Sequence, residues 1–307
     1  MHAAIVTSFD TPPHYGEHPD PVVGGEGEMV VEVLAAGLHR LVKARATGQH
    51  YSSTGTFPLV PGVDGVVRDQ QGNLRYAVVE GAAGTFAERT VIDPRRSVVL
   101  PDDVDPVRIA AAMNPAMSSW VALRRRIAFQ KGQSVLVLGA TGSSGRMAVQ
   151  IAKRFGAERV IAAGRDAARL APLTDLGADE TVTFDQADRA ADVDVVIDYV
   201  WGEPAALAMA AMITTRRDRR APLDWIQIGS VAGQTAPVDS ALLRASRLQL
   251  CGSGIGSLSP RDLLEELPEL AVAVHSGEIE VRSRPVPLAR IAETWDARTD
   301  DRIVYVP

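Results

Sequence analysis

Hydrophobic and polar positions alternate differently in two parts of the chain, and the pattern changes near residue 110. Before residue 110, short apolar runs are separated by Gly, Pro and Asp, which is typical of short strands joined by turns. These runs cover residues 3–7, 29–35, 65–68, 77–79, 87–92 and 97–100. The pattern predicts a β-rich, barrel-like N-terminal domain.

After residue 110, strand-like and helix-like segments alternate. Strands are predicted at 134–138, 159–163, 180–184, 193–199, 225–228 and 248–251, and helices at 144–155, 167–176 and 242–247. The run 193–199 is apolar throughout, as expected for a strand that is covered on both faces of a parallel sheet. The alternation favours βαβ units. A further helix at 260–275 and a strand at 303–306 lie in the last fifty residues.

The chain is therefore predicted to be an α/β protein with three parts. Residues 1–114 form the β-rich domain, residues 115–256 form a doubly wound domain, and residues 257–307 form a C-terminal segment. The length of 307 residues suits two domains.

Composition narrows the classes of partner. The net charge is −6 and the basic residues form no stripe, so nucleic acid and anionic membrane surfaces are not expected partners. The single cysteine, Cys251, allows no intramolecular disulfide and no thiolate zinc cluster. The N-terminus lacks the layout of a signal peptide, and no apolar run approaches the roughly 18 residues of a membrane span. A cytoplasmic protein is expected.

A glycine-rich segment between a predicted strand and a predicted helix carries the clearest chemical signal. Its glycines recur at three-residue intervals, which allows a tight turn, close approach of a pyrophosphate, and phosphate binding at the helix N-terminus. The predicted phosphate-binding residues are Gly139, Ala140, Thr141, Gly142, Ser143, Ser144 and Gly145. A strand-to-helix turn without a ligand has the same glycines. The amphipathic helix and the second strand about twenty residues later favour a dinucleotide.

The second strand ends at Gly164 and Arg165. An NAD enzyme usually places a carboxylate here for the ribose 2′-hydroxyl, whereas an arginine suits the 2′-phosphate of NADP. Arg169, one helical turn later, is a second candidate contact. A solvated helix start is the alternative, because Asp166 lies beside Arg165. The predicted cofactor is NADPH.

Other candidate cofactor-binding residues lie where predicted strands end. Tyr199, Gly229 and Ser230 follow strands at the edge where ligands collect in such sheets. Gly254 lies in a glycine-rich loop that either lets the nicotinamide approach the backbone or acts as a hinge. Asn114 is a polar residue in an otherwise apolar crossing segment.

Several sequence blocks, in order, resemble the medium-chain dehydrogenase/reductase superfamily, in particular its zinc-free quinone oxidoreductase and enoyl reductase branch. The blocks are Met29–His39, Phe57–Val66 with its Pro-Gly-Val-Asp-Gly signature, Ala110–Trp120, the glycine turn, and Gly164-Arg165. The resemblance implies a GroES-like N-terminal domain that binds substrate, a Rossmann domain that binds NADPH, and a C-terminal segment that returns to the first domain. Relatives in this branch often dimerise through the cofactor domain, so a homodimer is expected.

The resemblance also bears on metal. Zinc-dependent members carry a Cys, a His and a further Cys or Asp as catalytic ligands. In this chain His39 stands where the first Cys would be, Val63 stands where the His would be, and the four-cysteine structural lobe is missing. A catalytic zinc needs three protein ligands. No catalytic metal is expected.

The same resemblance suggests catalytic candidates. It places His39 facing the nicotinamide, where the ring could donate a hydrogen bond or a proton, although backbone groups or the cofactor ribose could also satisfy it. Tyr51 lies near a substrate-contacting tyrosine of relatives, and packing is the alternative. Ser119 lies near the nicotinamide by resemblance, and a helix start would also explain it. Asp64 is expected to brace its loop.

The leading hypothesis is hydride transfer from NADPH to a small, fairly apolar quinone or α,β-unsaturated carbonyl. The alternatives are a carbonyl reductase or alcohol dehydrogenase of the same fold, and an NADPH-binding protein with little turnover that acts as a redox sensor or structural protein. A short-chain dehydrogenase is excluded, since none of the lysines Lys43, Lys131 and Lys153 completes a Tyr-x-x-x-Lys pair. A hydrolase of the Gly-x-Ser-x-Gly type is excluded likewise.

Overall fold

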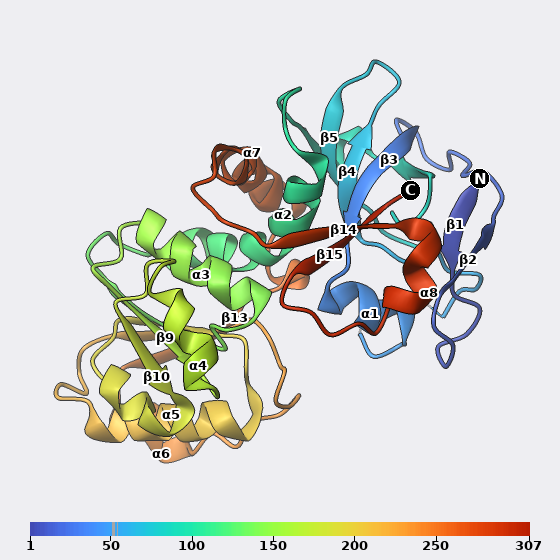
Figure 1. Cartoon of the computed structure of the whole chain (residues 1–307). Helices are drawn as coiled ribbons and strands as arrows, with labels where there is room; N and C mark the ends of the chain where they lie inside the picture. Colours follow the sequence, from blue (N-terminus) through green and yellow to red (C-terminus); the bar gives the residue numbers. More distant parts are fainter. Residues whose placement is uncertain (51–52, 54) are drawn as a thin grey trace. The chain divides into compact units, whose positions relative to one another are not determined.

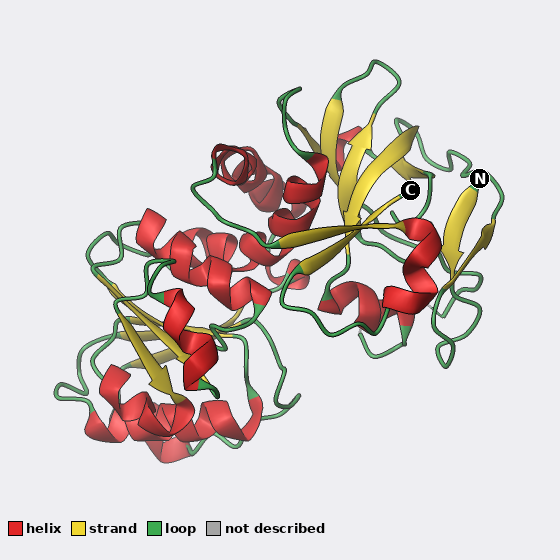
Figure 2. Cartoon of the chain, in the orientation of Figure 1, coloured by secondary structure: helices red, strands yellow, loops and turns green. Residues whose placement is uncertain are grey.

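The computed structural model describes residues 1–50, 53 and 55–307, which divide into two compact units. The first unit comprises residues 1–114 and 264–307, and the second comprises residues 115–263. Figure 1 traces the chain through both, and Figure 2 shows that strands dominate the first unit, whereas helices flank the sheet of the second.

The first unit is built on a mixed sheet with the strand order β14-β15-β3-β4-β5-β7, in which β6 also pairs with β3. A separate antiparallel pair is formed by β1 and β2. The elements are β1 (His2–Ile5), β2 (His14–Glu17), β3 (Met29–Gly37), α1 (Arg40–Ala46), β4 (Asp64–Arg68), β5 (Leu74–Val78), β6 (Arg89–Ile92), β7 (Ser97–Val99), β14 (Ser283–Pro287), α8 (Ile291–Thr294) and β15 (Arg302–Val306).

The C-terminal segment returns to the first unit, as expected. Strand β15 pairs antiparallel with β3, so that Val304 lies opposite Gly37 and Tyr305 opposite Ala36. Strand β14 then adds to β15 in parallel. The fully buried Tyr305 packs edge-on against Phe86, which joins the last strand to the core of this unit.

The second unit contains a six-stranded sheet with the order β10-β9-β8-β11-β12-β13, in which all pairs are parallel. Its elements are β8 (Ser134–Leu138), α3 (Ser143–Arg154), β9 (Arg159–Gly164), α4 (Ala167–Leu170), β10 (Glu180–Thr183), β11 (Val195–Asp198), α5 (Gly202–Thr215), β12 (Leu223–Gln227), α6 (Ser240–Ala245) and β13 (Leu248–Gly252). The order reverses between β8 and β11, which is the topological switch point of a Rossmann sheet. The predicted fold class is confirmed.

Two helices, α2 (Pro106–Val121) and α7 (Pro260–Ser276), each begin in one unit and end in the other. A π-helical turn, Ala122–Arg126, follows α2. The second boundary falls at Leu263 and differs from the predicted Gly256. Residues 257–263 belong to the second unit. Within it, Arg126 Nη1 donates a hydrogen bond to the Ser257 carbonyl at 3.2 Å.

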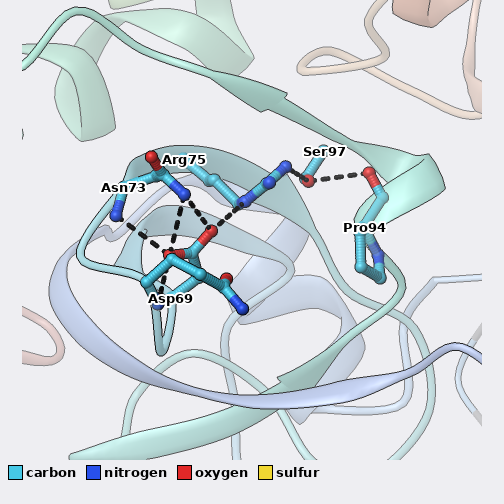
Figure 3. A network of polar contacts seen from close by, with 6 residues as sticks. Asp69, Asn73, Arg75, Pro94 and Ser97 are labelled. Carbon is cyan, nitrogen blue, oxygen red and sulfur yellow. Dashed lines mark hydrogen bonds and ion pairs between the residues drawn. The ribbon is translucent and has the colours of Figure 1, made fainter.

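The buried Asp69 carboxylate stabilises the hairpin between β4 and β5 through hydrogen bonds (Figure 3). It accepts hydrogen bonds from the backbone of Gln71 and Asn73, from the Asn73 amide, and from Arg75 Nε at 2.8 Å. Arg75 reaches on to Ser97 Oγ at 3.2 Å. This network fixes the strand register, and that register places the polar side chains described below.

Among the described residues, no helix is long and apolar enough to cross a membrane.

Candidate functional site

The glycine turn lies at the switch point, between β8 and α3. Gly139 has φ +84°, and the N–H groups of Gly139 and Ala140 both donate to the Ala163 carbonyl at 3.0 Å. Gly142 is the N-cap of α3, and no side chain caps this end. The first N–H groups of a helix have no partner inside the helix. The start of α3 therefore offers donors and a positive dipole end to an anion.

Close packing explains part of the glycine pattern. A Cβ on Gly145 would overlap the Gly139 carbonyl oxygen and would lie 2.6 Å from Ala140 Cα. A Cβ on Gly164 would lie 3.2 Å from Thr141 Cγ2. Packing therefore requires Gly145 with or without a ligand, whereas a Cβ on Gly142 would meet only the Gly139 carbonyl oxygen, at an ordinary 3.6 Å. The uncapped helix start, which packing does not explain, is the feature that favours a phosphate.

Two exposed arginines follow β9: Arg165 comes directly after the strand, and Arg169 belongs to α4. The neighbouring Asp166 carboxylate accepts hydrogen bonds from the N–H groups of Ala168 and Arg169 and caps α4. Within the described part of the chain, the Arg165 guanidinium has no hydrogen bond or ion pair. Because the carboxylate is engaged with the helix, Arg165 remains available to a 2′-phosphate.

Tyr199 and Gly229 lie beside the glycine turn, where strands β11 and β12 end. A Cβ on Gly139 would lie 3.4 Å from Tyr199 Cβ, and one on Gly229 would lie 2.7 Å from the Tyr199 carbonyl oxygen. The Tyr199 hydroxyl lies 2.9 Å from Ser118 Oγ. Burial raises the pKa of Tyr199 to about 12, against the opposing effect of hydrogen bonds with Ser118 and Ser119. The phenol therefore keeps its proton at neutral pH.

The remaining predicted cofactor residues are more scattered. Ser119 is fully buried and donates to the Ala116 carbonyl at 3.3 Å, which its helix explains. Asn114 is half-buried and belongs to the first unit. Ser230 follows β12 and is also half-buried. The Gly254 N–H donates to Ser257 Oγ at 2.9 Å, in the loop after β13.

In the first unit, His39 joins a buried cluster. His39 immediately precedes α1, Asp64 opens β4, and Tyr76 lies on β5. His39 Nε2 lies 2.7 Å from Asp64 Oδ1, and the Tyr76 hydroxyl donates to Asp64 Oδ2 at 2.8 Å. His39 is 6% exposed, Asp64 1% and Tyr76 0%. We call these three residues the His39 cluster.

Charge in the His39 cluster is balanced by Arg302. Its Nη1 donates to the Leu38 carbonyl at 2.9 Å, and burial lowers the pKa of Arg302 to about 10 while the Asp64 charge opposes this. Arg302 is therefore a cation at neutral pH. Burial, followed by the charge of Asp64, raises the pKa of Tyr76 well above its usual value, so Tyr76 stays protonated.

One polar atom of the His39 cluster is unsatisfied. His39 Nδ1 is buried and has no hydrogen-bond partner among the described residues. A buried polar group left without a partner costs about 1–3 kcal/mol.

From its sequence context Asp64 is expected only to brace its loop, and no sequence pattern points to Tyr76 or Arg302. The contact between Asp64 and Tyr76 depends on the β4–β5 register, which pairs Val66 with Tyr76 and so puts Tyr76 diagonally opposite Asp64 on one face. A buried Asp at a strand start followed by a Tyr on the next strand was the available signal. Tyr51, the other predicted catalytic residue, lies outside the described residues.

Comparison with known proteins fixes the family. The chain is 32% identical over 359 aligned residues to a probable NADPH-dependent quinone reductase of Emericella nidulans, covering 100% of both proteins. It belongs to the medium-chain dehydrogenase/reductase superfamily. Within this superfamily it falls in the quinone oxidoreductase branch.

Further matches agree with that assignment. The family described as zinc-binding dehydrogenase matches residues 145–272. The quinone oxidoreductase of Thermus thermophilus, solved alone and with NADPH, has the same fold, with a TM-score of 0.82 at 24% identity and all of both chains covered. A 2-methylene-furan-3-one reductase of Solanum lycopersicum is 28% identical over 57% of this chain and 50% of that protein.

The zinc named in that family description does not fit the side chains of this superfamily member. Across residues 1–50, 53 and 55–307, no group of three or more His, Cys, Asp or Glu side chains could hold a metal ion. His39 and Asp64 contact each other, and Val63 offers no ligand atom. NADPH, by contrast, fits the uncapped start of α3 and the available Arg165.

Proposed function

We propose that this chain is an NADPH-dependent, metal-free reductase of quinones or α,β-unsaturated carbonyls. The printed names of the full-length Emericella relative and of the tomato relative support this acceptor class. The observation that carries the proposal is the uncapped start of α3 at the switch point, with the available Arg165 at the end of the next strand.

Most of the proposed cofactor contacts lie in the second unit. The N–H groups at 142–145 bind the pyrophosphate, and Arg165 and Arg169 bind the 2′-phosphate. The other proposed contacts are Ser119, Asn114, Tyr199, Gly229, Ser230 and Gly254. Bound NADPH supplies the hydride.

The first unit is proposed to bind the acceptor, and His39 is its proposed catalytic side chain. No step requires a metal, which agrees with the lack of a ligand set in the described part of the chain. The single cysteine, Cys251, supports a reducing compartment, and we propose a cytoplasmic location.

A homodimer through the sheet of the second unit is also proposed. Strand β13 ends the sheet order and leaves one edge unpaired by the described residues, with Leu250 exposed upon it. Such an edge is a template for a second copy of the same strand.

Purified protein tests the proposal in two steps. Binding of NADPH and NADH is measured by the quenching of tryptophan fluorescence, and oxidation of NADPH is then followed with a panel of quinones, enones and aldehydes. Tight NADPH binding with turnover of quinones or enones is expected. Tight binding without any turnover would favour the cofactor-binding protein instead, and turnover of aldehydes alone would favour a carbonyl reductase. Turnover that survives removal of metals by chelation is expected as well.

A further inference from the structure

One bulky residue near the switch point of the second unit has a strained backbone. Trp201 follows β11 and has φ +50° and ψ −165°, and it is the one non-glycine residue with a positive φ among residues 1–50, 53 and 55–307. This part of backbone space favours glycine, so a tryptophan occupies it only where its surroundings impose it. Gly202 follows with φ +68°. Strain of this kind is typical of ligand sites.

The buried carboxylate of Asp198 holds the strained segment. Asp198 Oδ1 accepts hydrogen bonds from the N–H groups of Val200 at 2.7 Å and Trp201 at 2.9 Å, and Oδ2 accepts from Trp225 Nε1 at 3.0 Å. Asp198 and Trp225 are both 0% exposed. Burial raises the pKa of Asp198, whereas these three hydrogen bonds favour its ionised form. No side chain caps the start of α5, so the carboxylate serves the segment before the helix and not the helix itself.

The residues that Asp198 holds pack directly on the glycine turn. Asp198 lies opposite Leu138 in the pairing of β11 with β8, so the two strands end at the same level. The Tyr199 N–H donates to the Leu138 carbonyl at 3.1 Å. A Cβ on Gly139 would lie 3.2 Å from Val200 Cγ2 and 3.4 Å from Tyr199 Cβ. The segment after β11 is therefore one wall of the turn that leads into α3.

The loop after β12 fixes the same segment from another side. The Ala232 N–H donates to the Val200 carbonyl at 2.9 Å, and a Cβ on Gly202 would lie 2.9 Å from the carbonyl carbon of Ala232. The segment has little room to relax toward that loop. Without the hydrogen bonds of Asp198, Trp201 would leave its positive φ, and Val200 would shift against Gly139.

We propose that Asp198 is a positioning residue of the cofactor site: it holds residues 199–202 against the glycine turn and so keeps the N–H groups at the start of α3 in place for the pyrophosphate. This inference rests on the proposed function. The pyrophosphate is common to NADPH and NADH, whereas Arg165 is proposed to bind the 2′-phosphate alone. Loss of Asp198 should therefore weaken the binding of both dinucleotides to the same degree.

Calorimetric titration of the whole chain with NADPH and with NADH tests this inference. D198A removes the acceptor of both backbone N–H groups and should raise the Kd for each dinucleotide about tenfold or more. The ratio of the two constants should stay within about twofold of wild type. D194A is the matched control, because Asp194 precedes the same strand at its other end and accepts from the Ser134 N–H and Oγ, each at 2.7 Å. D194A should lower the urea midpoint and change neither Kd by more than about twofold.

The variant W201G tests whether strain is what Asp198 holds. Glycine adopts a positive φ without help, so the double variant D198A/W201G should bind both dinucleotides with a Kd within about threefold of that of W201G. A loss of stability alone would not be recovered in this way, since W201G also removes apolar surface packed on the core of the second unit. Should D198A not fold, D198N carries the test. It turns an amide N–H toward Trp225 Nε1–H and should raise both Kd values about threefold or more.

The outcomes separate this inference from the proposed function. If D198A or D198N folds and keeps the wild-type Kd values, Asp198 does not position the cofactor, and the inference is wrong while the reductase assignment stands. The inference is also wrong if D194A, at an equal loss of urea midpoint, raises both Kd values as much, or if D198A weakens the binding of NADPH alone. A wild type that binds neither dinucleotide refutes the proposed function itself, and the wild-type titration alone shows this.

Discussion

At the scale of single residues, Arg165 is the proposed determinant of which dinucleotide the second unit prefers. It is exposed at the end of β9, and the carboxylate beside it, Asp166, is engaged in capping α4. A carboxylate facing the ribose would repel a 2′-phosphate, whereas a guanidinium binds it through charge-assisted hydrogen bonds. The direction of the Asp166 side chain therefore matters as much as the presence of Arg165.

Replacing Arg165 with Ala should raise the Kd for NADPH about tenfold or more, since a hydrogen bond to a charged group contributes roughly 1.5–3 kcal/mol. The Kd for NADH should change little. Both constants are measured by fluorescence titration. R217A is the matched control, because Arg217 is an exposed arginine of the same unit that pairs with Asp192. Equal effects of R165A on NADPH and NADH would refute the 2′-phosphate role.

The candidate residues of the two units differ in how far the sequence reveals them. The glycine turn and Arg165 are local, so spacing along the chain is enough to find them. The His39 cluster is not local. His39 lies 25 residues from Asp64, and Asp64 lies 12 residues from Tyr76, and only the strand register brings the three together. Only the three-dimensional structure shows that His39 Nδ1 has no hydrogen-bond partner among the described residues.

At the scale of elements, prediction succeeded where the apolar residues form an unbroken short run or a stripe on one helix face. Strands β8, β9 and β13 and helix α3 were predicted to within a residue or two, because buried strands are continuously apolar and α3 is apolar on one face. Helix α5 was missed, since its Ala- and Met-rich sequence is apolar on most sides and shows no stripe. Strand β14 was missed because Pro285 and Pro287 resemble a loop.

A predicted helix over 167–176 was too long. Helix α4 ends at Leu170 and continues only as a 3₁₀ turn, Ala171–Leu173, which contains Pro172. Proline lacks the N–H that an α-helix would use there, so the α-helical pattern stops.

The β4–β5 hairpin carries a prediction about pH. Hydrogen bonds from Arg75 and Asn73 lower the pKa of Asp69 to about 2, from a usual value of 3.8. A carboxyl whose folded pKa is depressed stabilises the fold above its unfolded pKa, and this contribution is lost as the pH falls through the folded value. The contribution of Asp69 should therefore be complete above about pH 5 and should disappear between about pH 4 and pH 2.

The comparison of wild type with D69N measures this contribution. The difference in urea midpoint should be largest near pH 6 and should shrink steadily below pH 4, with D69N the less stable protein at neutral pH. D10N serves as the control, since Asp10 is an exposed carboxylate of the same unit. If the difference in urea midpoint between wild type and D69N stays constant down to pH 2.5, the charge of Asp69 does not contribute to stability.

At the scale of the whole molecule, the open edge of β13 predicts how copies associate. Replacing the exposed Leu250 with Lys places a charge on this edge, and charged edge residues block strand pairing. The mass measured by light scattering after gel filtration should fall from that of a dimer to that of a monomer. L207K is the control, because Leu207 is an exposed apolar residue of the same unit that belongs to helix α5 and not to an edge strand. A dimer that survives L250K would place the interface elsewhere.

The pairing of β15 with β3 also sets an order of events during synthesis. Arg302 bonds the Leu38 carbonyl across 264 residues of chain. At about 5–20 residues per second, the ribosome adds the last strand roughly 10–50 s after the third. The second unit is one continuous stretch and can fold during that interval, while the first waits unfinished with the β3 edge uncovered. His39 follows Leu38 directly, so the buried contact between His39 and Asp64 is among the last parts of the first unit to gain its final surroundings.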